Sequence, residues 1–425
     1  MKKLSNLIYA LFCIDIAIFL AATCFAGLHS GIPLQAALLA GIVFALFGSY
    51  VLFLKGYYRV RSFKPKDIYL LFEGIILGAI IPAAIVLLVN FSAETLKFLV
   101  FNFIFTCILL LVWRSGFWWY KKHFESATNV LILGNNPAGY DIYKEITNRP
   151  ELNFNVTEVV DGAGLENSLK NYRVDLVVNC TDKEISSEEL SRSPEVYEMS
   201  AVYEKITHKV PVNHITEDWF RENFAENLEK PVYAVLKRIF DIGSAVVILL
   251  VTFPVLLIVA LSVKLYDGGP VLYVQNRIGK NGRTFRFYKL RTMVQNADKA
   301  GIIDKVEAED ERVLPVCRIA RKARFDEIPQ MINILKGDMS IVGPRAEFED
   351  FVREYEKVIP FYNRRHDIIP GWTGWAQINQ GHCVTVEDIT EKLRYDFYYI
   401  KHRNIFWDFS ILLRAVFLAL SGRHR

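Results

Sequence analysis

A chain of 425 residues is long enough for two or three domains, and 52% of its residues are hydrophobic, which is high for a soluble enzyme and agrees with the positive mean hydropathy. The six cysteines are scattered singly without CxxC spacing, so neither a disulfide framework nor a zinc site is expected. The formal net charge is only +4. Its basic residues cluster where an anionic membrane surface would lie, so we expect membrane lipids and no nucleic acid as partners.

Four apolar segments occupy the start of the chain, at residues 4–26, 32–54, 68–89 and 98–119. Each is close to the roughly 20 residues that cross a bilayer as a helix. Basic residues follow the second and fourth segments, whereas the loops after the first and third have almost none. By the positive-inside rule, residues 1–122 therefore form a four-helix transmembrane anchor with both ends in the cytosol, and all that follows is cytosolic.

Two acidic residues, Asp15 and Glu73, lie inside these predicted spans. Ionisable residues within a membrane span are functional candidates, because an isolated charge is costly there. A polar contact between two helices of the anchor explains both residues equally well. The sequence leaves the two interpretations open.

Residues 123–225 alternate between short apolar runs and helical segments. Strands are expected at 129–133, 155–160, 174–179 and 209–212, and this order predicts a small Rossmann-like α/β domain with a parallel sheet of about four strands.

The turn after the first of these strands, Gly134 to Gly139, resembles a dinucleotide-binding fingerprint, and Asp161 ends the second strand where a ribose-binding acid would lie. However, Asn136 replaces the second glycine and Pro137 follows it, which removes the close backbone approach to a pyrophosphate. We therefore expect no bound nicotinamide and favour a regulatory, nucleotide-sensing or dimer-forming domain.

A second apolar element covers residues 242–265 and contains Phe253-Pro254. A fifth crossing would place the strongly basic segment 264–291 outside the cell, against the positive-inside rule. Proline removes a backbone donor and kinks or breaks a helix. We therefore predict a re-entrant membrane helix over 237–266 that returns to the face it entered; the alternative is a kinked span.

Two adjacent carboxylates, Asp326 and Glu327, lie inside a basic stretch. Residues 270–345 contain 15 Lys or Arg against 9 Asp or Glu. A carboxylate among cations stays ionised, and it can then act as a nucleophile toward phosphorus or as a metal ligand. The alternative is a surface acidic pair at the start of a helix, where acids suit the helix dipole.

Six ordered segments follow one another after residue 236. They are Lys237-Arg238 with Asp241, Gly269-Pro270-Val271, Phe287-Tyr288-Lys289-Leu290-Arg291-Thr292-Met293, Arg324-Phe325-Asp326-Glu327-Ile328-Pro329-Gln330, Leu335-Lys336-Gly337-Asp338-Met339-Ser340-Ile341-Val342-Gly343-Pro344-Arg345, and Pro370-Gly371-Trp372-Thr373-Gly374-Trp375-Ala376-Gln377. Together they closely resemble the bacterial sugar transferases known as polyprenyl-phosphate phosphoglycosyl transferases, of the large monotopic kind. Ala346 stands where the family usually has a second proline after the arginine.

The resemblance implies the architecture of the longer members, such as undecaprenyl-phosphate glucose or galactose phosphotransferases. These are α+β membrane proteins of the bacterial inner membrane. The expected parts are the multi-pass anchor, the Rossmann-like domain, and a mostly helical, monotopic catalytic domain over 226–425 with its re-entrant helix. The resemblance also implies a homodimer.

The same resemblance implies the reaction, in which a hexose-1-phosphate passes from a UDP-sugar to undecaprenyl phosphate and UMP is released. It initiates O-antigen, capsule or exopolysaccharide synthesis. Asp326 matches the family's nucleophile, which forms a covalent phosphosugar ester, and Glu327 matches its Mg²⁺ ligand. Physically, two-step covalent catalysis lets one site serve a water-soluble donor and a membrane-bound acceptor in turn.

Cations should surround the transferring group, because phosphoryl transfer depends on positioning and charge stabilisation. The best candidates are Lys289, Arg291, Arg321 and Arg345; for each, the alternative is a lipid-headgroup contact or a solvated surface position. Other residues near the matched segments have structural alternatives: His366 and His382 as hydrogen-bonded structural residues, Trp372 and Trp375 in the membrane interface or the core, and Asp396 with Tyr398 and Tyr399 as supports of the site.

Two other classes of function compete with the transferase. A membrane-bound nucleotide-sugar oxidoreductase or dehydratase would use the middle domain and needs a bound nicotinamide. A non-catalytic scaffold of polysaccharide assembly would have no need to keep Asp326, Glu327 and their cations together.

Overall fold

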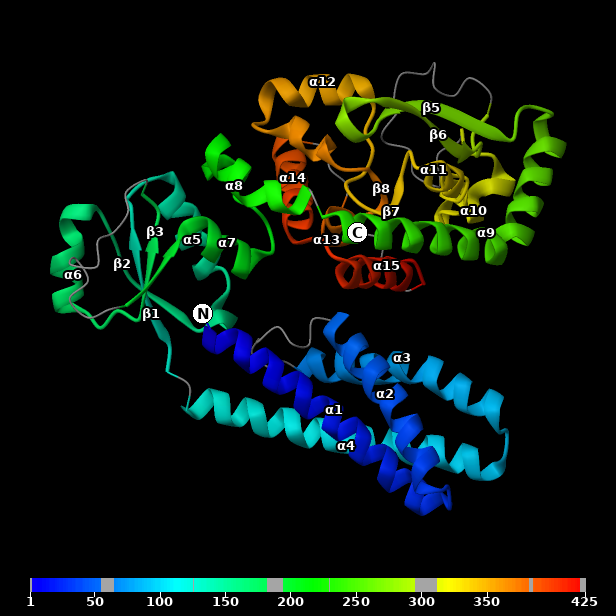
Figure 1. Ribbon diagram of the computed structural model, residues 1–425, viewed down its shortest axis with the longest axis horizontal. Helices are drawn as coiled ribbons and strands as arrows, with labels where there is room; N and C mark the ends of the chain where they lie inside the picture. The colour runs from blue at the N-terminus through cyan, green and yellow to red at the C-terminus, as the bar shows by residue number, and fades with distance from the viewer. Residues whose placement is uncertain are drawn as a thin grey trace. The chain divides into compact units, whose positions relative to one another are not determined.

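The computed structural model describes residues 2–54, 65–124, 126–181, 194–228, 230–294, 312–381 and 385–420 (Figure 1). Its contacts divide the chain into two compact units, Met1–Tyr197 and Glu198–Arg425. The first unit contains a helical bundle and a parallel sheet. The second is mostly helical and carries the Asp326-Glu327 pair.

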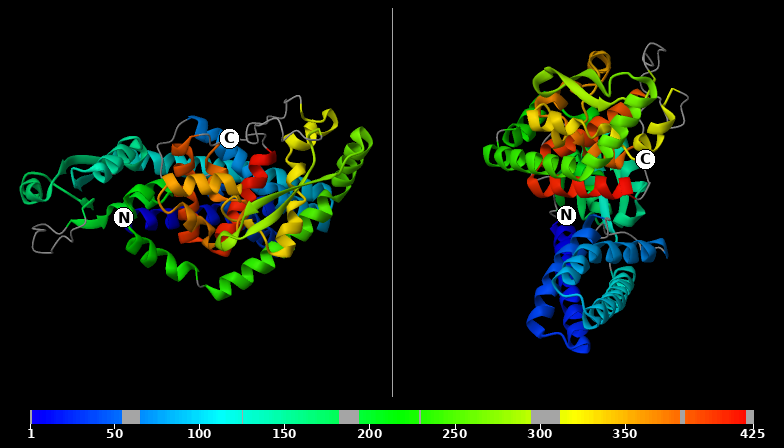
Figure 2. Two further views of the ribbon diagram at one scale, coloured as in Figure 1. Left: turned by 90° about the horizontal axis from the view of Figure 1, so that it is seen from above. Right: turned by 90° about the vertical axis from the view of Figure 1, so that its right-hand side faces the viewer.

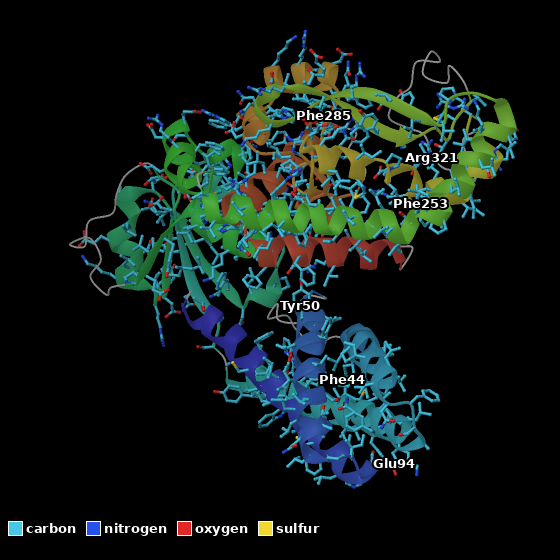
Figure 3. All side chains as sticks on the ribbon, turned by 45° about the vertical axis from the view of Figure 1, so that its right-hand side comes forward. Phe44, Tyr50, Glu94, Phe253, Phe285 and Arg321 are labelled. Carbon is cyan, nitrogen blue, oxygen red and sulfur yellow. The ribbon has the colours of Figure 1, made fainter. Side chains whose placement is uncertain are left out.

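Four helices form the bundle, as the apolar segments predict. They are α1 (Lys2–Ser30), α2 (Leu34–Leu54), α3 (Pro65–Val89) and α4 (Ala93–Phe124). Consecutive helices pack together, and α1 also packs on α4. Within the described residues, α1, α2 and α4 each hold a segment long and apolar enough to cross a membrane. The side chains of Phe44 and Tyr50 are labelled on α2 in Figure 3.

One buried ion pair joins the first and last helices of this bundle. Asp15 of α1 accepts a hydrogen bond from the Arg114 guanidinium of α4, and their side chains are 0% and 3% exposed. Nearby, the Thr23 hydroxyl of α1 donates to Asn102 of α4 at 3.0 Å. Of the two interpretations offered for Asp15, the structure therefore shows the polar contact between two helices. The side chain of Glu73 lies outside the described part of the structure.

The sheet confirms three of the predicted strands. Its strands are β1 (Thr128–Leu133), β2 (Phe154–Val160), β3 (Leu176–Asn179) and β4 (Glu195–Glu198), in the order β2-β1-β3-β4. Strand β1 runs parallel to both β2 and β3. The helices α5 (Pro137–Thr147) and α6 (Leu165–Asn171) follow β1 and β2, which is the alternation expected of a Rossmann-like unit.

The fourth predicted strand, at 209–212, is wrong, because the fourth strand is β4. Val210 and Val212 are instead buried in the core of the second unit, and the main-chain N–H of Val210 donates to the carbonyl of Arg394. A short apolar run indicates burial but not the element that is buried, so it cannot distinguish a strand from a packed connector.

The second compact unit begins at Glu198, before residue 226, where the catalytic part is predicted to start. Helices α7 (Met199–Thr207) and α8 (Glu217–Leu228) belong to the second unit. Phe220 and Phe224 of α8 pack in its core, with their rings stacked against each other at 4.0 Å. Glu204 of α7 is paired with Lys401 at 2.8 Å.

The second unit places two short sheets among helices (Figures 1 and 2). Its strands are the antiparallel pair β5 (Leu272–Ile278) and β6 (Thr284–Leu290), and the parallel pair β7 (Ser340–Val342) and β8 (Gly371–Thr373). Its remaining helices are α9 (Pro231–Asp267), α10 (Arg318–Lys322), α11 (Gln330–Lys336), α12 (Glu349–Val358), α13 (Trp375–Asn379), α14 (Val386–His402) and α15 (Ile405–Leu420). One apolar core joins most of these elements, and a second, smaller cluster packs α10 against the last part of α9.

Helix α9 is the predicted second membrane element, and it continues through Pro254 without a break in the helix. It changes direction partway along its length (Figure 2). Its first part is tied down by Arg238, which donates to the carbonyls of Ile334 and Leu335 at the end of α11. Its last part packs through Val259 and Val263 against the region of α10. Both parts of α9 thus contact the same folded unit.

Candidate active site

A single 3₁₀ turn, Phe325–Glu327, carries both carboxylates between α10 and α11. The residue before it, Arg324, has a left-handed backbone with φ of 57°, a conformation that non-glycine residues rarely adopt and that recurs at functional sites. Asp326 and Glu327 are 2% and 8% exposed. The interpretation of Asp326 and Glu327 as a surface acidic pair is therefore wrong, because both side chains are buried.

Lys289 of β6 lies against the first carboxylate. Its Nζ is 2.9 Å from Asp326 Oδ2. The strand is held in place by Asn333 of α11, which accepts from the Tyr288 N–H at 3.1 Å and donates to the Arg286 carbonyl at 2.6 Å. The fully buried Asn333 amide thus hydrogen-bonds the main chain of β6 as a neighbouring strand would. It fixes the part of β6 from which Lys289 extends.

Arg345 lies against the second carboxylate, with Nη2 at 3.3 Å from Glu327 Oε1. It follows β7, where two backbones approach closely. A Cβ on Gly371 would collide with the Gly343 nitrogen, and one on Gly374 would collide with the Gly343 carbonyl oxygen. Glycine is required at these positions because only its lack of a side chain permits the approach. The glycines of the two matched segments therefore bring Arg345 to the site.

Arg321 and Arg291 differ in what they contact. Arg321 of α10, labelled in Figure 3, donates to the Thr292 hydroxyl at 3.3 Å, and its charge lowers the pKa of Asp326. The Arg291 Nε donates to the Pro270 carbonyl at 2.6 Å, and its side chain is buried. Arg291 thus ties the end of β6 to the segment before β5, whereas Lys289, Arg321 and Arg345 act on the carboxylate pair.

Burial and these cations give the two carboxylates different proton affinities. Burial raises the pKa of Asp326 above 3.8, and Lys289 only partly opposes this effect. Burial would also raise the pKa of Glu327, but Arg345 and Lys289 outweigh it and hold that pKa at about 2. Glu327 is therefore a fixed anion near neutral pH. Asp326 is the more basic carboxylate, which suits a nucleophile.

The pair also fits one mode of metal binding. No group of three or more His, Cys, Asp or Glu side chains gathers in the part of the chain that the structure describes, so a cage made only of protein ligands is not found there. Mg²⁺ is usually bound through one or two carboxylates together with substrate phosphates. Glu327, an ionised carboxylate beside a second one, matches that donor set.

Arg365, which lies in none of the motifs found in the sequence, contacts the main chain of the site residue Arg345. Its Nη2 donates to Asp396 Oδ2 at 2.8 Å and to the Arg345 carbonyl at 3.0 Å. Arg277 likewise donates to the Ala346 carbonyl at 2.6 Å. A run of basic residues in a sequence does not reveal which cation is buried.

The remaining predicted residues are mostly structural. Trp375 is 2% exposed and packs in the core, which excludes the membrane interface for it. Burial lowers the pKa of His366 to about 3, so this histidine is neutral, but its buried Nε2 has no hydrogen-bond partner among the described residues, unlike the hydrogen-bonded residue that the sequence predicted. Tyr399 donates to Asp408 at 2.7 Å and Tyr398 contacts His208 at 3.0 Å.

The predictions for Trp372 and His382 remain. Trp372 is partly buried and packs against the same core. His382 lies outside the described residues.

The glycine turn of the middle domain is occupied by its own polar groups. Asn136 accepts from the Gly139 N–H and donates to the Cys180 carbonyl at 2.7 Å. Asp161 accepts from the Asn135 N–H at 3.1 Å. These are the helix N-terminus and the acid that a dinucleotide would use, and in this structure both form local hydrogen bonds.

Comparison with known proteins identifies the family. The profile described as "Bacterial sugar transferase" matches residues 232–422. The UDP-glucose:undecaprenyl-phosphate glucose-1-phosphate transferase of Escherichia coli (strain K12) is 30% identical over 90% of this chain and 88% of its own length.

Two other relatives align mainly with part of the chain. The UDP-N-acetylgalactosamine-undecaprenyl-phosphate N-acetylgalactosaminephosphotransferase of Aeromonas hydrophila is 39% identical over 53% of this chain; this chain spans about half, 52%, of that relative's length. The exopolysaccharide production protein PSS of Rhizobium leguminosarum bv. phaseoli is 38% identical over 43% of this chain and 94% of its own length. The alignment with the E. coli protein covers most of both chains. Together with the profile match, it shows that this chain belongs to the bacterial sugar transferase family.

Proposed function

We propose that this protein transfers a sugar-1-phosphate from a UDP-sugar to undecaprenyl phosphate, releases UMP, and so initiates a lipid-linked glycan. The observation that carries the proposal is the buried Asp326-Glu327 pair, with Lys289 at 2.9 Å from Asp326 and Arg345 at 3.3 Å from Glu327. The names of the relatives from E. coli and Aeromonas hydrophila describe transferases of this type.

In the first step, a carboxylate oxygen of Asp326 attacks the β-phosphorus of the UDP-sugar. The bond from that phosphorus to the bridging oxygen breaks, and UMP leaves with the electron pair. In the second step, a phosphate oxygen of undecaprenyl phosphate attacks the same phosphorus and displaces Asp326 as a free carboxylate. Each step forms one P–O bond and breaks another, so no oxidant or reductant is needed.

The cations account for how an anionic nucleophile could approach an anionic diphosphate. Lys289 is held beside Asp326, and Arg321 lowers the pKa of the same carboxylate. Arg345 offers a planar guanidinium, which suits phosphate oxygens. Mg²⁺, held by Glu327 and substrate phosphates, would supply further charge neutralisation when bound. Arg291, whose guanidinium contacts the Pro270 carbonyl, is assigned a supporting role.

We further propose that α9 is re-entrant and that the second unit lies on the cytosolic face of the bacterial inner membrane. The contacts of both parts of α9 with one folded unit support this arrangement, as does its largely exposed apolar surface. Phe253, 62% exposed, belongs to that surface and is labelled in Figure 3. A single straight crossing would separate those two parts across the bilayer. The homodimer stays a prediction of the family resemblance.

The experiment is UMP release by the purified full-length protein in detergent or nanodiscs, with undecaprenyl phosphate and a panel of UDP-sugars. The panel includes UDP-glucose, UDP-galactose and UDP-N-acetylgalactosamine. We expect sustained turnover with at least one sugar and none by Asp326→Asn, which keeps the shape of the side chain but removes the nucleophilic charge. Full activity of Asp326→Asn would overturn the assignment of the nucleophile, and no turnover with any UDP-sugar would overturn the reaction.

A further inference from the structure

The buried guanidinium of Arg365 connects the Asp396 carboxylate to the main chain of Arg345. Its side chain is 1% exposed and that of Asp396 is 2% exposed. Nε and Nη2 of Arg365 both donate to Asp396 Oδ2, at 3.2 and 2.8 Å. Nη2 also donates to the Arg345 carbonyl at 3.0 Å. The guanidinium lies 5.3 Å from the centre of the Tyr362 ring.

We propose that Arg365 is a positioning residue of the transferase site, which fixes the main chain of Arg345 so that the Arg345 guanidinium is held at Glu327. This inference rests on the proposed function. Arg365 is too buried to touch a substrate, so it acts only through Arg345. Asp396, on the long helix α14, holds Arg365 in turn.

Arg365 is needed because the side chain of Arg345 is long and 27% exposed. A long exposed side chain loses conformational freedom when it binds, unless its main chain is already fixed. The neighbouring carbonyl of Ala346 is held by Arg277 at 2.6 Å, and that of Glu347 by the Ile278 N–H at 3.0 Å. Arg345 itself forms a β-bridge with Gly371, and Arg365 adds a side-chain hydrogen bond to the Arg345 carbonyl.

Lysine cannot reproduce this arrangement. Its ammonium is a point charge on a flexible stem, whereas the flat guanidinium donates to a carboxylate and a carbonyl at once. Arg365→Lys keeps a positive charge beside Asp396 and so avoids the larger penalty of a buried unpaired carboxylate. Arg364→Lys is the matched control, because Arg364 is adjacent in sequence but 40% exposed and paired with Glu217.

The test is a double-mutant cycle on UMP release, with Arg365→Lys, Arg345→Ala and the double variant. We expect Arg365→Lys alone to lower kcat by about 10- to 100-fold, because a small misplacement near the reacting groups is costly. The KM for the UDP-sugar should change far less. In the Arg345→Ala background, the same substitution should lower kcat by less than about 2-fold, because two residues that act through one contact are not additive. Arg364→Lys should match the wild type.

The outcomes separate the two proposals. Equal losses in both backgrounds would mean that Arg365 only supports the fold, and would overturn the inference while leaving the proposed function intact. Full activity of Arg345→Ala would overturn both the role of Arg345 in the proposed function and this inference. If Arg365→Lys fails to fold, Asp396→Asn takes its place in the cycle, since Asn can still accept from Arg365 but loosens its hold; the same non-additivity is expected, and additivity contradicts the inference.

Discussion

Asp241 of helix α9 accepts a hydrogen bond from the main-chain N–H of Ile341 in β7, at 3.0 Å between Oδ1 and N. The same oxygen accepts from the Ser340 hydroxyl at 2.9 Å. Arg345 follows three residues after β7. This contact therefore joins α9 directly to the chain segment that leads to a site cation.

Replacing Asp241 by Ala should loosen that joint and destabilise the second unit. The change leaves the buried Ile341 N–H without this acceptor, which costs about 1–3 kcal/mol, whereas the Ser340 hydroxyl can still donate to the Val342 carbonyl at 3.1 Å. Thermal denaturation in detergent measures the loss, and Asp241→Asn, which retains one acceptor oxygen, should lose less. Equal stability of Asp241→Ala and the wild type would show that the contact contributes nothing.

The close backbone approach at Gly371 predicts a steric effect in the same unit. Gly371→Ala would force a Cβ into the Gly343 nitrogen, so the chain must shift and Arg345 move with it. We expect a strong loss of both stability and UMP release. Gly243→Ala on α9 is the control, because its added Cβ meets nothing within 4 Å, and alanine favours a helix. A fully active, stable Gly371→Ala would contradict the proposed packing.

The sequence predicted that cations surround the Asp326-Glu327 pair, because the two acids and many basic residues lie close together along the chain. It could not distinguish the roles of Lys289 and Arg291, which lie two positions apart. Lys289 contacts Asp326, whereas Arg291 contacts the Pro270 carbonyl. Alternation along a strand places the two on the same face, and only tertiary contacts distinguish them. For the same reason Arg365 was not found.

Fold prediction succeeded where a pattern was long. The four apolar helices and strands β1, β2 and β3 were found from their hydrophobic runs, which are the strongest signal in a sequence. The fourth strand was misplaced because Val210 and Val212 belong to the apolar core of the second unit and not to the sheet. The continuity of α9 across Pro254 could not be predicted from the sequence, because a proline can either kink a helix or end it.

The pKa of Asp326 predicts a pH dependence of the reaction. Burial raises that pKa above 3.8, and Lys289 lowers it. Protonated Asp326 cannot attack phosphorus, so kcat/KM should fall as the pH drops through the raised pKa, which is a higher pH than for an ordinary aspartate. Lys289→Met removes the opposing cation and should move this acidic limb to still higher pH.

Lys289→Met should also lower kcat, by about 10²- to 10³-fold if it acts as a single charge-stabilising donor does in other active sites. Lys280→Met is its control, since Lys280 lies exposed in the turn of the same hairpin. The pH profiles of both variants are measured by UMP release. An unchanged acidic limb in Lys289→Met would contradict the assigned coupling with Asp326.

The buried pair of Asp15 and Arg114 predicts a stability effect in the N-terminal bundle. Asp15→Ala removes the carboxylate that pairs with the buried Arg114 charge, and breaking a buried pair in this way typically costs about 3–5 kcal/mol. Asp15→Leu combined with Arg114→Leu should recover most of that loss, because neither charge remains. Denaturation of the full-length protein in detergent measures both, and a single variant as stable as the wild type would argue against a structural pair.

The covalent step through Asp326 is tested most directly by supplying the UDP-sugar that turns over and omitting undecaprenyl phosphate. We predict a burst of UMP that approaches one molecule per active site, together with a protein mass increased by one sugar phosphate on the peptide that contains Asp326. Asp326→Asn should give neither signal. If the wild-type protein releases no UMP and gains no mass until undecaprenyl phosphate is added, the two-step account is contradicted and the lipid must attack the UDP-sugar directly.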